Sequence, residues 1–480
     1  MNQQPGKAAA FAELMALRGP GEVAPDEVQI TASDPFYATP YRVGETVAAA
    51  IAGIGVAAND IWQSRTGRRQ ALRVDVREAA ATLRTVDYTQ ARNAAGAYEP
   101  LPIPDAMAHM LTVTQPWQTR DGRWVLPHFN LRHLGERVRG VLGCDITPES
   151  VSAAVATWDS DALEEAIATA RACGGKVRTP EEWLAHPQGR YLADRPVIEI
   201  TRLGDSAPET FAPAARPLSG VRVLDLTRIL AGPIAGRSLA EHGADVLMVT
   251  AEKLQQTPEH VRDTSHGKRS CFLDIARADE ADRLRALAAQ ADVFIDGYRP
   301  QRLAAHGFAV DELVRLRPGL VHLSVCCFGS GGPWAGRAGW EQVAQAVTGV
   351  CHINGLFTNG GRPKLVFAPV SDYTTGYLGA FGVMLALARR AREGGSYQVQ
   401  ISLCQSAMFL QRQGLLERFD GAPGRLTPGE FEALSVASDT CYGALKTLGP
   451  ALRISETPCR WARPAPRLGG DRPEWLARPL

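Results

Sequence analysis

Two short stretches carry residue types that can hold an anion. Gly329-Ser330-Gly331-Gly332-Pro333 is a glycine-rich loop whose backbone N–H groups could cradle a phosphate. It is not a Walker loop, because no Gly-Lys-Ser/Thr follows it. Lys268-Arg269 is either an anion clamp or a solvated turn, and the sequence leaves both open. These stretches allow an anionic ligand without identifying it.

The segment Arg216–Val249 is predicted to form a strand, a turn, a helix and a second strand. Val221–Leu226 is an apolar run that favours a strand, and Asp245–Val249 is another. Pro233 suits a helix start and Gly243 a helix end. A strand, helix and strand in this order form a right-handed βαβ unit, whose binding crevice lies at the carboxyl ends of its strands. The expected fold class is α/β, with a Rossmann-like large domain built on a parallel sheet.

Several other chemistries find no support in the sequence. No G-x-G-x-x-G follows the first strand, so NAD binding is poorly supported, and no G-x-S-x-G elbow indicates an α/β-hydrolase. The nine cysteines include no CxxC pair and no His/Cys ligand spacing. We therefore expect no metal site, and the unpatterned cysteines suit a reduced cytosol.

Composition points to an ordinary globular protein without a polyanionic partner. Lys+Arg number 52 against 51 for Asp+Glu, a net charge of +1, which gives no sign of nucleic-acid or membrane-surface binding. The most apolar run, Val47–Ile61, covers about 15 residues and falls short of the roughly 20 that span a bilayer. The N-terminus has too short an apolar core for a signal peptide. We expect a soluble cytoplasmic protein.

Part of the sequence occurs twice. Two helices rich in small residues, Val43–Trp62 and Gly376–Arg390, are each followed by a glycine turn, a short strand and another helix. The copies are offset by a constant 327 residues, which aligns Gly55 with Gly382, Val56 with Val383, Gly67 with Gly394, Val74 with Ile401 and Ala80 with Ala407. We interpret this as a partial internal duplication, not a short-period solenoid.

A small α+β region is predicted between the copies, over about residues 105–205. His109–Thr114 and Arg123–His128 are β-like runs around Asp121-Gly122, a hairpin signal. Leu131–Leu142 is predicted to be helical. Leu203–Arg216, rich in Ala and Pro, is the expected linker into the larger domain.

Six stretches in a fixed order resemble the family III CoA-transferases, which include formyl-CoA transferase and the carnitine CoA-transferases, with α-methylacyl-CoA racemase as an isomerase relative. They are PLSGVRVLDLTRILAGP (217–233), GADVLMV (243–249), GKRSCFLDI (267–275), ADVFIDGYRP (291–300), RPGLVHLSVCCFGSGGPWAGRAGWEQVAQAVTGV (317–350) and APVSDYTTGYLGAFG (368–382). The resemblance covers about 170 residues of the chain.

The resemblance implies a rearranged, partly duplicated layout of that family. The expected segments are an N-terminal arm (1–42), linker helices of the first copy (43–104), a small α+β domain (105–207), a Rossmann-like CoA-binding large domain (216–370), linker helices of the second copy (371–415) and a C-terminal return segment (416–480). No small domain follows the second copy, so 105–205 would serve the one large domain. Family members are interlocked dimers, which implies a homodimer with its site between large and small domains.

The resemblance also implies a cleft for coenzyme A, bound as a substrate. The adenine–phosphate end would meet Arg228, Ile229, Leu230 and Ala231. Lys268 and Arg269 would neutralise phosphate. The pantetheine path would be lined by Asp296, Gly297, Tyr298 and Arg299. The family usually has Asn where this chain has Gly297, so one side-chain contact is missing.

Glu341 occupies the position of the family's nucleophilic Asp. The implied reaction moves CoA from an acyl-CoA to a carboxylic acid through a glutamyl anhydride and a glutamyl-CoA thioester. Glu is about one methylene longer than Asp, and a misplacement near 1 Å can cost about 100-fold. The amides of Gly329, Gly331 and Gly332 would stabilise an oxyanion or bind the carboxylate.

Three alternatives stay open. Glu341 could instead be a surface carboxylate in the first turn of a helix. The chain could be a catalytically impaired CoA-binding or partner subunit. It could also be an acyl-CoA isomerase, lyase or racemase-like enzyme, but Trp340 replaces the racemase His and cannot shuttle a proton. Asp372, the racemase partner carboxylate, is present and is either structural or substrate-orienting.

Overall fold

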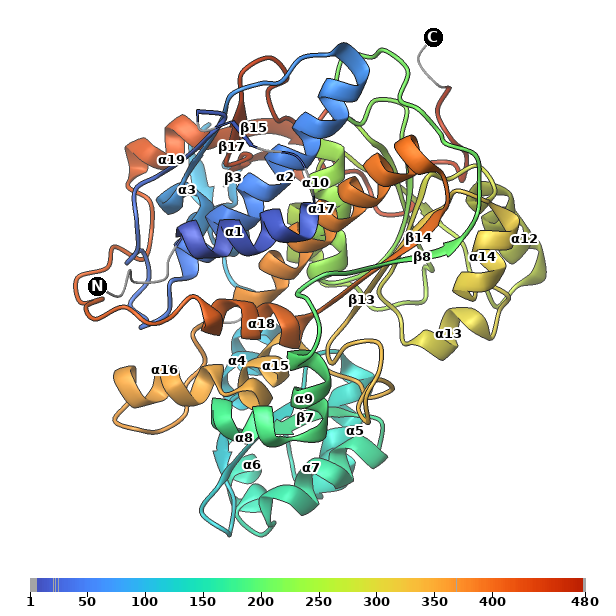
Figure 1. The fold of residues 1–480 in the computed structure, drawn as a ribbon. Coiled ribbons are helices and arrows are strands. Elements are labelled where there is room, and N and C mark those ends of the chain that lie inside the picture. Colours follow the sequence, from blue (N-terminus) through green and yellow to red (C-terminus); the bar gives the residue numbers. More distant parts are fainter. Residues whose placement is uncertain (1–6, 20, 22, 25, 368, 478–480) are drawn as a thin grey trace.

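The computed structural model describes residues 7–19, 21, 23–24, 26–367 and 369–477 (Figure 1). Parts of two predicted segments, residues 1–6, 20, 22 and 25 of the N-terminal arm and 478–480 of the return segment, therefore lie outside the described residues, as does position 368, the first residue of the last family stretch.

A seven-stranded sheet forms the core of the large domain, in the order β11-β10-β9-β12-β13-β14-β8. The strands are β8 (Glu199–Gly204), β9 (Arg222–Leu226), β10 (Asp245–Thr250), β11 (Arg269–Phe272), β12 (Val293–Asp296), β13 (Val321–Cys326) and β14 (Ser396–Ser402). All neighbours are parallel except β14 and β8, which pair antiparallel at the edge. The predicted α/β fold class with a parallel sheet is confirmed.

Helices connect the strands, and α10 and α17 among them pack on the sheet. These connecting helices are α10 (Ala231–Glu241), α11 (Pro258–Thr264), α12 (Ala278–Ala288), α13 (Pro300–Ala304), α14 (Val310–Leu316), α15 (Glu341–Thr348), α16 (Val350–Thr358) and α17 (Val370–Glu393). The unit β9–α10–β10 is the predicted βαβ. Helix α10 packs on α17, which is buried over nearly its whole length.

Glycines on α17 allow this close packing. A Cβ atom on Gly376 would lie 2.5 Å from the Ile234 Cβ and 2.6 Å from the Ala231 carbonyl oxygen, both on α10. On Gly379 it would lie 2.7 Å from the Ile401 Cδ1 of β14. Real Cβ atoms essentially never approach so closely, so glycine at these positions sets where α10 begins relative to the sheet.

The first copy of the duplication folds like the second. Helix α2 (Val43–Thr66), β2 (Leu72–Asp75) and α3 (Val76–Ala81) repeat α17, β14 and α18 (Leu403–Arg412). Helices α2 and α17 pack against each other (Figure 1). Strand β2 lies in a three-stranded sheet between β1 (Val28–Thr31), which is parallel to it, and β17 (Leu452–Ile454), which is antiparallel.

The small α+β region has its own sheet and core, in the cyan and green lower part of Figure 1. Its sheet is β5 (Trp117–Gln118), β6 (Trp124–His128) and β7 (Cys173–Lys176), covered by α5 (Arg132–Leu142), α6 (Pro148–Val155) and α7 (Ser160–Thr169). The hairpin turn at Asp121-Gly122 is present, with φ 75° at Gly122. The predicted strand His109–Thr114 is wrong, because most of it belongs to helix α4 (Asp105–Val113). Short apolar runs do not distinguish strand from helix by periodicity alone.

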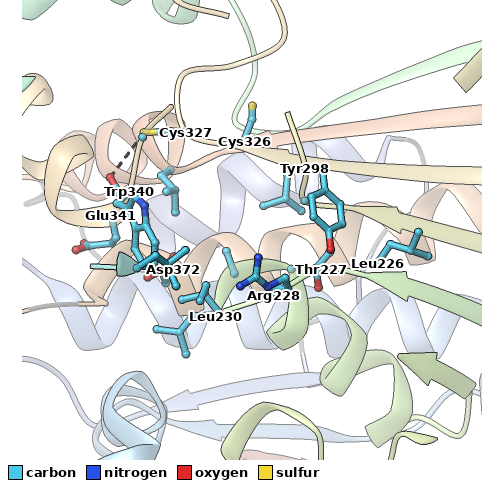
Figure 2. Close-up of a pocket in the computed structure, with 18 residues that line it drawn as sticks. Leu226, Thr227, Arg228, Leu230, Tyr298, Cys326, Cys327, Trp340, Glu341 and Asp372 are labelled. Atoms are coloured by element: carbon cyan, nitrogen blue, oxygen red, sulfur yellow. Dashed lines mark hydrogen bonds between the residues drawn. The ribbon is translucent and has the colours of Figure 1, made fainter. Parts of the chain in front are cut away.

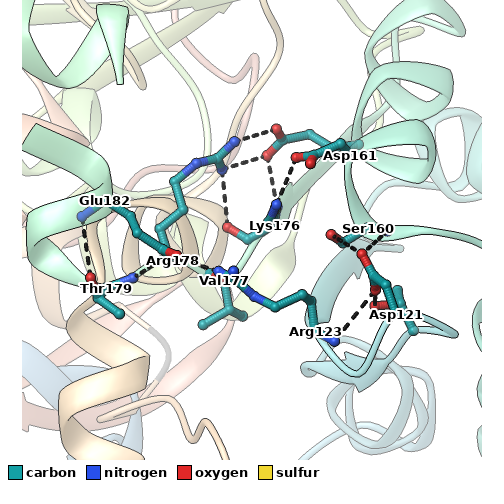
Figure 3. Close-up of polar contacts among 11 residues, drawn as sticks. Asp121, Arg123, Ser160, Asp161, Lys176, Val177, Arg178, Thr179 and Glu182 are labelled. Carbon is teal, nitrogen blue, oxygen red and sulfur yellow. Dashed lines mark hydrogen bonds and ion pairs between the residues drawn. The ribbon is translucent and has the colours of Figure 1, made fainter. Parts of the chain in front are cut away.

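Polar contacts order the segment after β7 within the small region (Figure 3), and one backbone contact joins this segment to the large domain. Arg178, just after β7, donates to both carboxylate oxygens of Glu164 on α7 at 2.8 and 2.6 Å. Its backbone N–H donates to the Ala346 carbonyl of α15 at 3.1 Å. Glu182 accepts from Arg123 at 2.7 Å and from the Thr179 N–H, which caps α8. The small region is thereby fixed against α15.

The remaining elements are helices that pack mainly on other helices, and a fourth sheet. They are α1 (Lys7–Arg18), the 3-10 helix η1 (Thr82–Tyr88), α8 (Pro180–Ala185), α9 (Pro187–Ala193) and α19 (Pro428–Leu434), with the four-stranded sheet of β15 (Ser435–Thr440), β16 (Gly443–Leu448), β3 (Gln90–Arg92) and β4 (Tyr98–Pro100). The C-terminal stretch returns to β11, where Asp471 N–H donates to the Ser270 carbonyl at 2.7 Å. Within the described ranges no helix is long and apolar enough to cross a membrane.

The glycine contacts lead to a matched pair of substitutions. Gly376→Ala should destabilise the protein by about 1–3 kcal/mol, because the added methyl group overpacks α10 against α17. Gly140→Ala, at an exposed position of α5 with nothing within 4 Å, should stabilise by about 0.5–1 kcal/mol. Urea unfolding measures both, and equal effects would contradict the packing argument.

Candidate active site

A cavity of about 220 Å³ opens at the carboxyl ends of β9, β12 and β13 (Figure 2). In the sheet, the chain runs from β9 to β10 on one side, and β12 lies on the other side of β9. The cavity therefore lies at the switch point where open α/β sheets bind ligands. Nine residues singled out from the sequence line it: Arg228, Ile229, Leu230, Ala231, Gly297, Tyr298, Trp340, Glu341 and Asp372.

Four helices begin at this cavity. The lining includes Ala231 at the start of α10, Glu341 at the start of α15, Asp372 in the first turn of α17 and Leu403 at the start of α18. Each helix N-terminus carries partial positive charge from unpaired N–H groups. Their convergence favours negative charge inside the cavity.

The Glu341 carboxylate is buried and held in one orientation. It is 1% exposed, and its Oε1 accepts from the Ser371 N–H at 3.1 Å. The Gln345 Nε2 lies 2.8 and 3.0 Å from its two oxygens. Gln345 is itself fixed, since its Nε2 donates to the Phe367 carbonyl and its Oε1 accepts from the Val366 N–H, both at 2.9 Å. Glu341 is therefore not the surface carboxylate of the first alternative.

Glu341 and Asp372 form a pair of buried carboxyl groups. Burial, followed by the like charge of Asp372, raises the pKa of Glu341 to about 8. Burial raises the pKa of Asp372 to about 7. Interacting carboxyl groups titrate as a pair, so near neutral pH the two groups share a proton.

The small α+β region contributes one wall of the cavity. Leu131 lines it, and the His128 ring stacks on Trp340 with centroids 4.6 Å apart. The His128 Nε2 lies 3.1 Å from the Gln342 Oε1. Burial lowers the pKa of His128 to about 3, so this ring is neutral. No motif marked His128, Leu131 or Gln345, although the four-residue spacing of Gln345 from Glu341 puts both on one helix face.

Ile229, where β9 turns into α10, has φ 75°. Left-handed backbone is an outlier for a β-branched residue. Such strain persists where surrounding structure imposes it, often at ligand sites. Here it bends the chain sharply around the rim of the cavity, which Ile229 lines.

Lys268 and Arg269 do not face the cavity, which corrects the prediction that they neutralise phosphate there. Lys268 is fully buried, and its Nζ donates to the Asp225 Oδ2 at 2.6 Å and to the Pro233 carbonyl at 2.7 Å. Arg269 pairs with Asp245 and donates to the Glu474 carbonyl. Lys268 instead ties β9 to the first turn of α10.

The glycine-rich loop also lies outside the cavity, which corrects its predicted oxyanion role. It packs under α9, where the Gln188 Nε2 donates to the Phe328 carbonyl at 2.7 Å and the Gly331 carbonyl at 2.9 Å. A Cβ atom on Gly331 would lie 2.4 Å from the Tyr191 hydroxyl, and one on Gly329 or Gly332 would meet other α9 side chains. The glycines serve close packing.

The two remaining predicted residues lie beside the cavity. Asp296 accepts from the Tyr298 N–H at 2.7 Å, and burial raises its pKa to about 7. Arg299 extends toward the small region, where its Nη2 donates to the Arg171 carbonyl at 3.3 Å. Neither is among the lining residues.

Arginines gather at the mouth of the cavity. Arg137 and Arg299 both donate to the Arg171 carbonyl, and Arg228 donates to the Gln255 carbonyl. None of these four arginines forms a salt bridge with a carboxylate among the described residues. A second cavity of about 110 Å³ shares Leu226 and Tyr298 with the first and is lined by Lys253, Arg302 and His306. Together these groups suit a ligand with several negative charges.

Comparison with known proteins confirms the predicted family. The sequence profile of CoA-transferase family III matches residues 218–435. The chain is 34% identical over 275 residues to an acyl-CoA transferase of Gibberella moniliformis, covering 54% of this chain and 48% of that protein. It is 31% identical over 322 residues to the acetyl-coenzyme A transferase nodX of Hypoxylon pulicicidum, covering 62% and 54%. Residues 218–435 are therefore similar to CoA-transferase family III.

The matches cover only part of each protein. The chain spans about half the length of the curated relatives it matches. The crystal structure of Rv3272 from Mycobacterium tuberculosis aligns with a TM-score of 0.38 at 29% identity, covering 41% of this chain and 58% of that one.

The position of Lys268 leads to a test of its structural role. Lys268→Met should destabilise the protein by about 3–5 kcal/mol, because Asp225 would be left charged and unpaired in the core. Lys253→Met, whose side chain is 61% exposed in its pair with Asp274, should change stability by less than about 0.5 kcal/mol. Chemical denaturation compares the two, and a Lys268 variant as stable as the Lys253 variant would contradict this role.

Proposed function

We propose that the chain transfers CoA from an acyl-CoA to a carboxylic acid, with Glu341 as the nucleophile. The observation that carries this proposal is a buried, rigidly oriented carboxylate in a cavity where four helices begin. A carboxylate is a weak nucleophile unless water is removed from it and the charge that develops on its target is stabilised. The match of residues 218–435 to the CoA-transferase family III profile supports the same reaction class.

The two neighbouring cavities, which share Leu226 and Tyr298, suit the length and charge of an acyl-CoA. The thioester would lie at Glu341, and the pantetheine arm would pass Tyr298 toward the second cavity. Lys253 and Arg302 there, with the arginines at the mouth, would bind the phosphates. Helix N-termini and unpaired arginines both favour polyanions.

The reaction balances without an added base or cofactor. A Glu341 carboxylate oxygen attacks the thioester carbonyl, and the CoA thiolate leaves, forming a glutamyl-acyl anhydride. The thiolate then attacks the Glu341 carbonyl, which releases the first carboxylic acid as its carboxylate and forms a glutamyl-CoA thioester. The acceptor carboxylate attacks the carbonyl of this thioester and expels the CoA thiolate, forming a second glutamyl-acyl anhydride. The thiolate then attacks the acyl carbon that came from the acceptor, and the Glu341 carboxylate leaves. Acyl-CoA is released and the Glu341 carboxylate is restored.

Protonated Asp372 is the proposed donor to the oxyanion of each tetrahedral intermediate. It lines the cavity next to Glu341, and burial raises its pKa to about 7, so the proton that the pair shares lies on Asp372 in a fraction of the molecules near neutral pH, with Glu341 ionised. Neutral carboxyl groups in apolar sites can donate in this way. The N–H groups of Ala231 and Gly232 at the start of α10 are a second source of donors, replacing the glycine-rich loop in this role.

Apolar residues from both regions would protect the intermediates from water. Leu131, Leu230 and Leu403 line the cavity together with Trp340. An anhydride or thioester is open to hydrolysis, and a dry cavity prevents that side reaction. Trp340 cannot act as an acid or base, which disfavours the racemase-like alternative. A cytoplasmic location and a homodimer stay predictions.

Chemical trapping tests the nucleophile. With acetyl-CoA as donor and hydroxylamine present, tandem mass spectrometry should find a hydroxamate at Glu341, because hydroxylamine cleaves a glutamyl thioester. Glu341→Gln should lose the adduct and at least about 1000-fold of turnover. The control Glu312→Gln, also in a first helical turn but remote, should keep both. No adduct together with unchanged turnover in Glu341→Gln would reject Glu341 as the nucleophile. CoA binding without any exchange would favour the partner-subunit alternative.

The carboxyl pair predicts a bell-shaped pH–rate profile. Glu341 must lose its proton, so activity should rise with pH, and Asp372 must keep its own, so activity should fall again, with a maximum between about 7 and about 8. Asp372→Asn should remove the alkaline limb and shift the acidic limb to lower pH, because the like charge beside Glu341 is gone. Asp372→Ala should in addition lose about 100-fold of kcat. An unchanged alkaline limb in Asp372→Asn would rule out Asp372 as the donor.

A further inference from the structure

The cavity around Glu341 has two chemically different ends. Figure 2 shows two separate groups of lining residues, with Leu230, Cys327, Trp340, Glu341 and Asp372 at one end and Leu226, Thr227 and Tyr298 at the other. The second cavity, which would take the phosphates, shares Leu226 and Tyr298 with this other end. In the proposed reaction the pantetheine arm occupies the Tyr298 side, so the acyl group of the substrate lies on the Glu341 side.

The Glu341 side of the cavity, here called the acyl end, has an apolar wall. Beside the two carboxyl groups it is lined by Leu230, Cys327, Trp340 and Leu403. Leu403 adjoins Cys327, because the Cys404 N–H donates to the Cys327 carbonyl at 3.0 Å. Burial raises the pKa of Cys327 well above its usual range, so its thiol is neutral. The wall therefore presents two leucines, an indole ring and an uncharged thiol.

The acyl end offers no cation to a charged substrate tail. Arg228 is the only Lys, Arg or His side chain among the described residues that line the cavity. Its guanidinium donates to the carbonyl of Gln255, which follows Lys253 and Leu254 in the wall of the second cavity. Glu341 and Asp372, which share one proton, already contribute a negative charge. A further carboxylate at the acyl end would be buried beside a like charge without a partner, which is costly.

We infer that the chain moves CoA between monocarboxylic acids with short apolar tails and excludes dicarboxylic acids, and that the ring of Trp340 limits the length of the tail. The apolar wall and the single cation at the opposite end carry the first part of this inference. The contacts that hold Trp340 carry the second part. The inference rests on the proposed function, since the thioester at Glu341 defines which end takes the acyl group.

Trp340 is held in place from two sides. Its ring stacks on His128, with centroids 4.6 Å apart and an angle of 27° between the planes. His128 is fully buried, and its Nε2 lies 3.1 Å from the Gln342 Oε1. The Trp340 carbonyl accepts from the Cys327 thiol at 3.7 Å. Trp340 therefore cannot move back to admit a longer tail without displacing a ring that is packed in the core.

The volume of the cavity also favours a short tail. The cavity measures about 220 Å³, whereas pockets for drug-sized ligands measure roughly 300–1,000 Å³. This volume must hold the thioester and the end of the pantetheine arm as well as the acyl group. Only part of it is therefore left for the tail beside Trp340.

A matched pair of acceptor acids tests the substrate class on the wild-type chain. Butyrate and succinate have the same number of carbons and differ by a methyl group against a carboxylate. With acetyl-CoA as donor, kcat/KM for butyrate should exceed that for succinate by at least about 100-fold, because the tail of succinate would be a buried, unpaired charge. Octanoate should be at least about ten-fold poorer than butyrate. Succinate as good as butyrate would overturn the substrate class and leave the proposed function standing, and octanoate as good as butyrate would overturn the length limit.

Binding measurements separate this inference from the proposed function. S-butyl-CoA and its analogue with a terminal carboxylate in place of the methyl group are thioethers, which Glu341 cannot attack. Calorimetry on the wild-type chain should find S-butyl-CoA bound at least about ten-fold more tightly than the carboxylate analogue. This comparison decides the substrate class even when no acid exchanges, a result that would reject the proposed function alone. Equal affinities, or binding of neither thioether, would overturn the inference.

The variant Trp340→Ala tests the length limit. Its ratio of kcat/KM for octanoate over butyrate should rise at least about ten-fold, because the tail gains the space of the indole ring. This ratio does not depend on the folded fraction, since both acids report on the same molecules. The control Trp158→Ala, in the core of the small region and absent from the cavity lining, should keep the wild-type ratio. If Trp340→Ala is inactive, the affinity for S-octyl-CoA relative to S-butyl-CoA should rise instead, and an unchanged ratio in both measurements would rule out Trp340 as the limit.

Discussion

The buried ion pair of Lys268 and Asp225 is the constraint on which the site depends. Asp225 lies on β9, and the Lys268 ammonium bridges it to the carbonyl of Pro233 in the first turn of α10. A Cβ atom on Gly236 would lie 2.6 Å from the Asp225 Oδ2, so α10 approaches this closely only because glycine stands there. Two charged groups that are removed from water are stable only when each has well-placed hydrogen-bond and ionic partners, as here. The pair fixes the turn from β9 into α10, and this turn forms one rim of the cavity.

The α/β fold class and the duplication could be predicted from the sequence because the patterns that indicate them are local. Apolar strands, Pro233 and Gly243 gave the βαβ unit, and the repeated glycines gave the duplication. The roles predicted for Lys268 and for the glycine-rich loop were wrong for the same reason. A Gly-Lys sequence is the same whether the lysine binds an anion at the surface or forms an ion pair in the core. A glycine-rich loop likewise allows close approach of a phosphate or of a helix such as α9. Only burial separates these cases, and burial depends on distant segments.

The wall from the small α+β region could not be predicted for a related reason. Leu131 reaches the cavity, and His128 stacks on the lining residue Trp340, because β6 packs on α15. Nothing in the run around these two residues has the spacing of a motif. Burial makes the His128 ring neutral, so it stacks on Trp340 as a flat apolar surface with one polar contact. Trp340, at the position of the acid–base His of the racemases, is thus part of the cavity wall here, and the His128 ring supports it.

The extra methylene of Glu341 is accommodated by what surrounds it. Ser371 N–H and Gln345 hold the carboxylate from two sides, and Gln345 is fixed by two backbone groups. A longer side chain costs rotamer entropy when it is ordered, and these contacts remove that freedom before a ligand arrives. The same contacts hold the carboxylate in its buried place beside Asp372, and burial, followed by the charge of Asp372, raises the pKa of Glu341. Orientation and proton sharing therefore have one cause, because the hydrogen bond that fixes Glu341 comes from the residue next to Asp372 on α17.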